Sequence, residues 1–280
     1  MKQLFISDLD GTLLRSHAVL SDFSRENLTT LLSEGFPFTI ATARSIVSVR
    51  EIMGDLPISL PVICGNGACV AELSTGKHYQ TFGLQKGTDR GILDIILEHG
   101  QTCFAATYDG EAEHLYMGEV RNEAMAAYEK ERLDAEDQRL RYVTELSQIV
   151  DEEVVCFNVI DREGPLKKLA NDIRAAYGEE LAMYYYENWY EEGWYWLSLY
   201  DKAANKGRAV AALAEQVGLS CEQVTVFGDN LNDSSMFKIA GKSVAPSNAV
   251  PSIHALATEI IDSNETDSVV KYLLKTTTQP

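Results

Sequence analysis

Short apolar runs alternate with amphipathic segments along the first eighty residues of the chain. Residues 4–6, 36–41 and 61–64 are apolar runs of strand length, and each is followed by small or polar residues. Between them, residues 22–34 and the segment that begins at Ser45 have apolar positions at helical spacing. This alternation of buried strands with helices predicts an α/β fold, a doubly wound parallel sheet of the Rossmann-like type.

The middle of the chain follows a different pattern, in which strands follow one another closely. Such closely paired strands predict an α+β unit with a largely antiparallel sheet. The strand–helix alternation returns at Lys206, so we expect the α+β unit to be inserted into the first domain. Glycines at 35 and 218 follow two predicted helices, where glycine commonly ends a helix. The predicted division is a core formed by residues 1–83 and 200–280, and an inserted domain formed by residues 84–199.

Acidic residues follow the first predicted strand directly, in the segment Asp8-Leu9-Asp10-Gly11-Thr12. Side chains alternate along a strand, so Asp8 and Asp10 point to one side and their charges repel. Open parallel sheets bind ligands at the carboxyl ends of their strands, and paired carboxylates there usually serve chemistry. A solvated turn is the alternative, because Asp and Gly are ordinary turn residues.

Polar residues also follow the other predicted strands, namely Thr42, Asn66 and the segment 228–233 with the sequence GDNLND. In a parallel sheet these strand ends converge on one crevice. Each has a structural alternative: Thr42 could cap the helix that follows, and Lys206 could be a solvated surface lysine. The segment 228–233 could be an acidic loop or an incomplete calcium site, although it lacks the glycine and glutamate of an EF-hand loop.

Composition narrows the classes of partner. The 280-residue chain has a formal net charge of −18, which argues against nucleic acid or an anionic membrane as a partner. A small anionic substrate can still bind where a metal, a lysine and backbone amides reverse the local field. The five cysteines are scattered and odd in number, so we expect them to be reduced and mostly buried. We find no targeting or membrane-spanning pattern and expect a cytoplasmic protein.

Four motifs in order give the chain a resemblance to a known family. It resembles the haloacid dehalogenase (HAD) superfamily of phosphatases, in the layout of the Cof-type hydrolases with a large α/β cap. The segment 8–12 matches the first motif, Thr42 the second, Lys206 the third and the segment 228–233 the fourth. The resemblance implies a HAD core with an inserted cap domain that governs substrate specificity. Three positions depart from the family pattern without removing a reacting group: Ala43, Pro246 and Ser268.

The resemblance also implies roles for the acidic residues. Asp8 would be the nucleophile that forms an aspartyl-phosphate, and Asp10 the general acid and base. Mg²⁺ would be the cofactor, bound by Asp8, the backbone carbonyl of Asp10 and Asp229, with Asp233 orienting a metal-bound water.

Uncharged donors and one lysine would bind the phosphoryl group. Phosphoryl transfer requires that charge on the phosphoryl oxygens be neutralised, which hydroxyls, amides and a lysine can do. Arg44 would contact the substrate at the mouth of the site, with Asn66. The predicted phosphate- and substrate-binding residues are Leu9 and Ala43 through their backbone amides, and Thr42, Arg44, Asn66, Lys206 and Asn232 through their side chains.

The predicted function is a Mg²⁺-dependent phosphatase that acts on a small phosphorylated metabolite, such as a sugar phosphate or a nucleotide-related phosphomonoester. The alternatives are a phosphomutase of the same type and a catalytically idle phosphate-binding regulator. A dehalogenase is less favoured, because carbon–halogen displacement does not need the acid and base that Asp10 provides.

The inserted domain contains an aromatic-rich stretch that could bind a substrate ring. Packing within an antiparallel sheet is the favoured interpretation, because such stripes usually belong to a core. Lys167, Lys168 and Arg174 could meet an anionic leaving group, although solvated helix charges are the default. The aromatic residues are Tyr184, Tyr185, Tyr186, Trp189, Tyr190, Trp194, Tyr195 and Trp196.

Overall fold

The computed structural model describes residues 3–187 and 192–277. The chain divides into two compact units, residues 1–81 with 204–280, and residues 82–203. We call them the core unit and the inserted unit. Among the described residues, no helix has the length and apolar character needed to cross a membrane.

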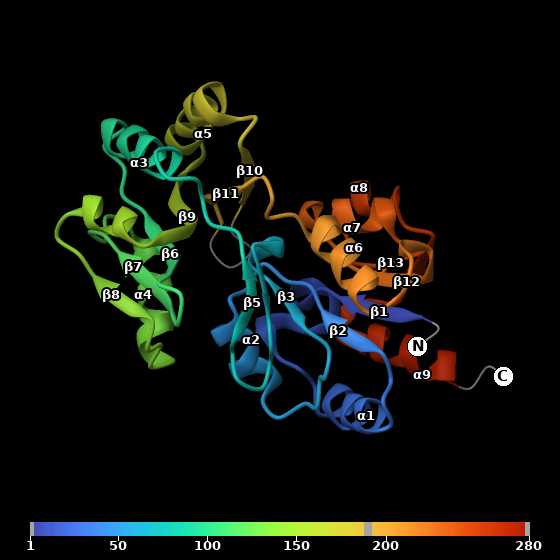
Figure 1. Cartoon of the computed structure of the whole chain (residues 1–280). Coiled ribbons are helices and arrows are strands. Elements are labelled where there is room, and N and C mark those ends of the chain that lie inside the picture. Colours follow the sequence, from blue (N-terminus) through green and yellow to red (C-terminus); the bar gives the residue numbers. More distant parts are fainter. Residues whose placement is uncertain (1–2, 188–191, 278–280) are drawn as a thin grey trace. The chain divides into compact units, whose positions relative to one another are not determined.

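The core unit is built on a five-stranded parallel sheet (Figure 1). All four pairs of neighbouring strands run parallel. This confirms the parallel α/β sheet predicted from the alternation of strands and helices. In sheet order the strands are β14 (Glu259–Ile261), β13 (Lys242–Pro246), β12 (Val224–Phe227), β1 (Leu4–Ser7) and β2 (Phe38–Ile40).

Helices cover both faces of this sheet, because successive strand residues point to opposite sides. In β1, Phe5 packs with one hydrophobic cluster, and Leu4 and Ile6 pack with another. The Phe5 cluster includes residues of α1 (Asp22–Ser33), α2 (Ile46–Met53) and α9 (Ser268–Thr277). The second includes residues of α6 (Lys206–Gln216), α7 (Ser234–Ile239) and α8 (Pro251–His254), so the sheet is doubly wound as predicted.

The third predicted strand belongs to a separate sheet. β3 (Val62–Cys64) pairs antiparallel with β4 (Cys69–Ala71), which pairs antiparallel with β5 (His78–Thr81). A tight turn at Gly65–Gly67 folds the chain back at the end of β3, so the following strand pairs with β3. A parallel bridge between Ala41 and Ile63 still connects β3 to the end of β2.

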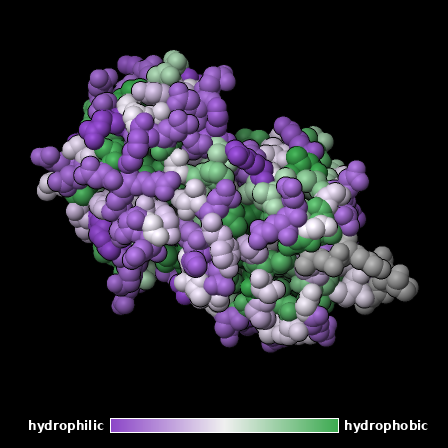
Figure 2. Space-filling model, in the orientation of Figure 1, coloured by the Kyte–Doolittle hydropathy of each residue, from purple (hydrophilic) through white to green (hydrophobic). Residues whose placement is uncertain are grey.

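The inserted unit contains a six-stranded sheet that is antiparallel except where β7 and β8 run parallel. Helices α3 (Thr88–Glu98) and α5 (Glu163–Tyr177) lie side by side and share one cluster, while α4 (Glu123–Asp134) packs into another (Figure 1). Hydrophilic residues cover most of this unit on the face shown in Figure 2. In sheet order the strands are β10 (Leu181–Glu187), β11 (Trp194–Asp201), β9 (Glu153–Arg162), β6 (Phe104–Tyr108), β7 (Glu113–Met117) and β8 (Leu140–Tyr142).

The aromatic stretch of the inserted unit packs within and beside its sheet. The rings of Tyr185 and Tyr195 stack across β10 and β11 with centroids 5.5 Å apart. Trp196 meets the edge of Tyr128 on α4 at 5.2 Å. These contacts agree with the favoured packing interpretation. Trp189 and Tyr190 lie outside the described residues.

The cysteines are free thiols, as the sequence predicts. Cys64, Cys69, Cys103 and Cys156 are buried, and Cys221 is partly exposed. Burial raises the pKa of the Cys103 and Cys156 thiols to about 12, so both remain protonated at neutral pH.

Several helices are followed by a residue with positive φ, in the left-handed region. Glycines at 35, 100 and 218 occupy this position after α1, α3 and α6, with φ between +66° and +80°. After α4 the corresponding residue is Glu136, which is exposed and has φ of +51°. A side chain at such a position strains the backbone, which glycine avoids.

Replacing Glu136 by glycine should therefore stabilise the inserted unit by about 1 kcal/mol. Gly100→Ala in the same unit makes the reverse change, because it adds a side chain at a residue with positive φ. The added methyl group meets nothing within 4 Å, so backbone strain alone should lower the stability by a similar amount. Urea unfolding of both variants measures the two effects, and a lower midpoint for Glu136→Gly would contradict the prediction.

Candidate active site

Three carboxylates meet where β1 and β12 end. The backbone N–H of Asp8, just after β1, donates to the carbonyl of Phe227 at the end of β12, at 2.9 Å. Asp229 and Asp233 follow β12. Asp8, Asp229 and Asp233 are 5%, 6% and 0% exposed, and each places a carboxylate oxygen within 4.8 Å of the others. The strand ends thus bring together residues more than 200 positions apart in the sequence.

Asp233 is the most fully bonded of the three. Its Oδ2 accepts the backbone N–H groups of Asp229 and Asn230, at 2.9 and 3.1 Å. Its Oδ1 accepts a hydrogen bond from Nζ of Lys206 at 2.6 Å. Asp233 therefore fixes both the loop that carries Asp229 and the position of the lysine.

Lys206 is the first residue of α6, and its side chain is fully buried. Its Nζ lies 3.0 Å from Oδ1 of Asp8 as well as contacting Asp233. Burial lowers the pKa of Lys206, but the charges of Asp233 and Asp8 outweigh this effect and raise it above the ordinary value. The lysine is thus a buried cation, which rules out the alternative of a solvated surface lysine.

The carboxylates carry more negative charge than Lys206 balances. Burial, followed by the charge of Asp233, raises the pKa of Asp8 well above its ordinary value. The same two causes, in the same order, raise the pKa of Asp229 to about 7. A divalent cation with a preference for oxygen ligands would relieve this repulsion, and the donor set of the cluster fits Mg²⁺.

Gly11 and Thr12 hold Asp229 in place, a role that the sequence analysis missed. The Thr12 hydroxyl donates to Oδ1 of Asp229 at 2.7 Å. Gly11 has φ of +70°, and a Cβ there would lie 2.5 Å from Oδ2 of the same carboxylate. The only sequence signal was the position of both residues directly after the paired aspartates, which does not reveal their contact with Asp229.

The structural alternative for Thr42, a cap of the following helix, is wrong. The N-cap of α2 is Ser45, whose hydroxyl accepts the N–H of Ser48. The Thr42 hydroxyl instead accepts the N–H of Arg44 at 3.2 Å, in the connection that also contains Ala43. Its oxygen has a fixed partner, and its hydrogen is the group that could be donated to a ligand.

Arg44 forms a two-pronged ion pair with Asp10. Its Nε and Nη2 donate to the two carboxylate oxygens at 2.7 and 2.6 Å, and Nη1 donates to the hydroxyl of Ser48 at 3.1 Å. This geometry fixes the orientation of the Asp10 carboxylate. The contact of Arg44 with a substrate stays a prediction.

The structure places Asn66 beside Asn232. Oδ1 of Asn66 accepts a hydrogen bond from Nδ2 of Asn232 at 3.0 Å, so β3 contributes to the site although it lies outside the main sheet. The side chain of Leu9 is buried in the Phe5 cluster. Ligand binding by its backbone N–H stays a prediction.

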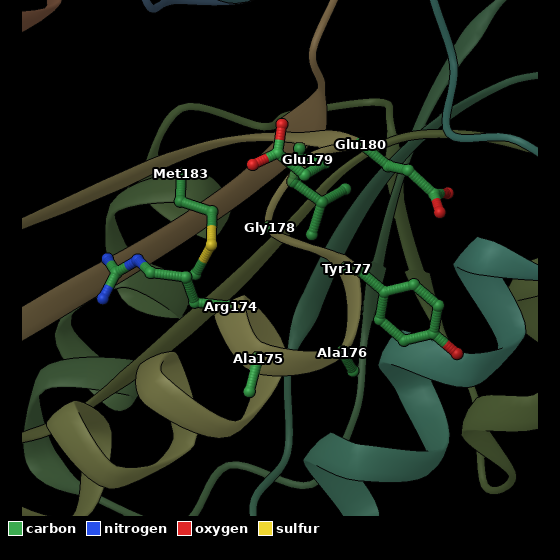
Figure 3. A pocket seen from close by; sticks show the side chains of 9 residues that line it. Arg174, Ala175, Ala176, Tyr177, Gly178, Glu179, Glu180 and Met183 are labelled. Carbon is green, nitrogen blue, oxygen red and sulfur yellow. The ribbon is translucent and has the colours of Figure 1, made fainter.

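The inserted unit has a hollow of about 590 Å³ at the carboxyl end of α5, lined in part by Arg174, Tyr177 and Glu180 (Figure 3). Arg174 donates to Oδ1 of Asn171, and Glu180 accepts from the Thr88 hydroxyl. Arg174 and Glu180 thus bond to residues of their own unit. Lys167 lies near Glu163 on the exposed side of α5, as a solvated helix charge would.

The sequence model of the haloacid dehalogenase-like hydrolase family matches residues 5–273 of the chain. The chain belongs to this family. Among solved structures, a haloacid dehalogenase-like hydrolase from Bacteroides thetaiotaomicron has a TM-score of 0.81 at 20% identity, with 99% of this chain and 100% of that chain covered. The HAD subclass IIB sugar phosphatase BT4131 has a TM-score of 0.77 at 17% identity, with 98% and 99% covered. These neighbours confirm the HAD fold.

Two sequence relatives are phosphatases. The chain is 23% identical to the 5-amino-6-(5-phospho-D-ribitylamino)uracil phosphatase YwtE of Bacillus subtilis (strain 168). It is 25% identical to the pyridoxal phosphate phosphatase YbhA of Escherichia coli (strain K12). Each alignment covers 95% of this chain and 95% of the relative. The enzyme class predicted from the sequence, a HAD-type phosphatase, agrees with both.

Replacing Gly11 by alanine should abolish most catalytic activity, because the new methyl group would displace the Asp229 carboxylate. A displacement of about 1 Å at a catalytic centre can lower the rate about 100-fold. Gly35→Ala is the matched control: its φ is +80°, but nothing lies within 4 Å of the added methyl group. Steady-state rates of the two purified variants test this, and equal activity in both would contradict the role given to Gly11.

Proposed function

We propose that the chain is a Mg²⁺-dependent phosphatase that hydrolyses a small phosphorylated metabolite through an aspartyl-phosphate on Asp8. The observation that carries the proposal is the buried cluster in which Lys206 bridges Asp8 and Asp233 while Asp229 lies beside them. Such a cluster combines a nucleophile, a fixed cation and surplus negative charge for a metal, which are the parts that phosphoryl transfer requires.

In the first step, an oxygen of Asp8 attacks phosphorus and the bond from phosphorus to the leaving oxygen breaks. Asp10 gives its proton to that oxygen, so the alcohol departs neutral. In the second step, Asp10 takes a proton from a water whose oxygen attacks phosphorus. The bond between the Asp8 oxygen and phosphorus breaks, which restores the Asp8 carboxylate and releases inorganic phosphate. The ion pair with Arg44 fixes the direction of the Asp10 carboxylate, and a carboxylate held in this way is ready to accept the proton of the attacking water.

Asp8, Asp229 and the backbone carbonyl of Asp10 would hold Mg²⁺, with Asp233 orienting a water bound to it. When bound, the metal would neutralise charge on the phosphoryl oxygens and on the surrounding carboxylates. The raised pKa values of Asp8 and Asp229 support this assignment, since both carboxylates lie in surroundings that disfavour their ionised form without a further cation.

Lys206 and a set of uncharged donors would bind the phosphoryl oxygens. The lysine also stabilises the ionised form of Asp8, the form that can act as a nucleophile. The donors in this proposal are the Thr42 hydroxyl, the Asn232 amide and the backbone N–H groups of Leu9 and Ala43.

The substrate would be a small phosphorylated metabolite, such as a sugar phosphate or a nucleotide-related phosphomonoester. This choice is supported by the names of the relatives, which act on pyridoxal phosphate, on a ribitylaminouracil phosphate and on sugar phosphates. Residues 84–199 would supply the contacts that select the rest of the molecule. The free cysteines and the net charge of −18 favour action in the cytoplasm, on neither nucleic acid nor membranes.

Asp8→Asn should remove hydrolysis of a generic phosphomonoester, because a neutral amide cannot form the aspartyl-phosphate. We expect a loss of at least about 10⁴-fold, as for other enzymes that lose a nucleophile. The assay measures released inorganic phosphate across a panel of phosphorylated metabolites, with Mg²⁺ and with a chelator. Asp94→Asn, an exposed aspartate on α3, is the control and should retain full activity.

Two outcomes contradict the proposal. Undiminished turnover in Asp8→Asn would remove the nucleophile from the mechanism. Wild-type turnover that is unchanged by the chelator would remove the metal.

A further inference from the structure

The turn after β3 is built from three consecutive residues in the left-handed region. Gly65, Asn66 and Gly67 have φ of +54°, +56° and +96°. Glycine adopts this conformation freely, whereas Asn66 adopts it with a side chain and is only 4% exposed. Strained backbone of this kind persists where the surrounding structure holds it and is common at functional sites.

This turn contacts three separate segments of the site. The N–H groups of Gly65 and Asn66 donate to the carbonyls of Arg44 and Thr42, each at 2.9 Å. Gly67 lies so close to the backbone of Asn205 that a Cβ would come within 2.6 Å of it, next to Lys206 in the sequence. The turn thus contacts both the connection after β2 and the residue before α6, and it fixes the position of each.

The third contact is made by a side chain. Oδ1 of Asn66 accepts one N–H of the Asn232 amide at 3.0 Å. An amide group is planar, so holding one N–H fixes the direction of the other. The second N–H of Asn232 is therefore oriented by Asn66, and a fixed donor binds an anion better than one that must first be ordered.

We propose that Asn66 is a positioning residue that acts through Asn232, by aiming the Asn232 amide at a phosphoryl oxygen. The inference rests on the proposed function, which places a phosphoryl group in this site. It differs from the prediction that Asn66 contacts the substrate itself. The near-complete burial of Asn66 and the engagement of its oxygen with Asn232 favour the indirect role.

A double-mutant cycle distinguishes the indirect role from direct contact. The variants are Asn66→Gly, Asn232→Ala and the two together. Glycine keeps the backbone N–H that bonds to Thr42 and accepts φ of +56° without strain, so Asn66→Gly should lose the side-chain hydrogen bond to Asn232 and still fold, which its thermal unfolding checks. Glu136→Gly, the same kind of change in the inserted unit, is the control and should leave the site unaffected.

The readouts are the affinity for inorganic phosphate, measured by calorimetry with Mg²⁺ present, and kcat/KM for the best substrate of the panel. We expect each single variant to lose about tenfold, the value of one oriented hydrogen bond to a charged group. The double variant should also lose only about tenfold, because removing Asn232 leaves Asn66 nothing to orient.

An approximately hundredfold loss in the double variant would mean that the two residues act independently and would overturn the inference. Wild-type phosphate affinity in Asn66→Gly would overturn it as well. Phosphate binding requires no turnover, so a protein that binds phosphate but hydrolyses nothing refutes the proposed function while the cycle still decides the role of Asn66. A wild-type protein that does not bind phosphate refutes the inference directly.

Discussion

The site depends on the burial of one positive charge, that of Lys206, between Asp8 and Asp233. A lysine in the first turn of a helix lies at the positive end of the helix dipole, and burial adds a desolvation penalty. Two carboxylates at 3.0 and 2.6 Å offset both effects. Asp8 directly follows β1, Asp233 lies in the turn after β12, and Lys206 is the first residue of α6. The ion pairs therefore hold together segments that are far apart in the sequence.

The same charges underlie the metal binding that we propose, and the residues around the carboxylates orient them. Lys206 neutralises about one of the three buried carboxylates, so the remaining charge favours a divalent cation or a proton. The neighbouring residues restrict which carboxylate oxygens are available to a cation. Thr12 donates to Oδ1 of Asp229, and backbone N–H groups donate to Oδ2 of Asp233. Neutral donors thus orient the Asp229 and Asp233 carboxylates without cancelling the charge that would attract a metal.

Local pattern was sufficient to predict the strands, the helices and the acidic strand ends, because side-chain alternation and helical spacing are properties of short segments. It could not predict the partner of β3, since pairing depends on where the chain folds back at Gly65–Gly67. It also could not show that Ser45, and not Thr42, caps α2, because the backbone path decides which hydroxyl reaches the helix. Thr12 and Asp229 are 217 positions apart, so no pattern in a short segment of the sequence predicts their contact.

In the function that we propose, the division into two units separates the chemistry of the reaction from the selection of the substrate. Every described residue to which we assign a part in the reaction lies in the core unit, whose hydrophobic clusters contain no residue of 82–203. The clusters of the inserted unit are likewise made of its own residues. Residues in one unit can change while the buried charges of the other stay fixed, which is the physical condition for one reaction to serve many phosphorylated substrates.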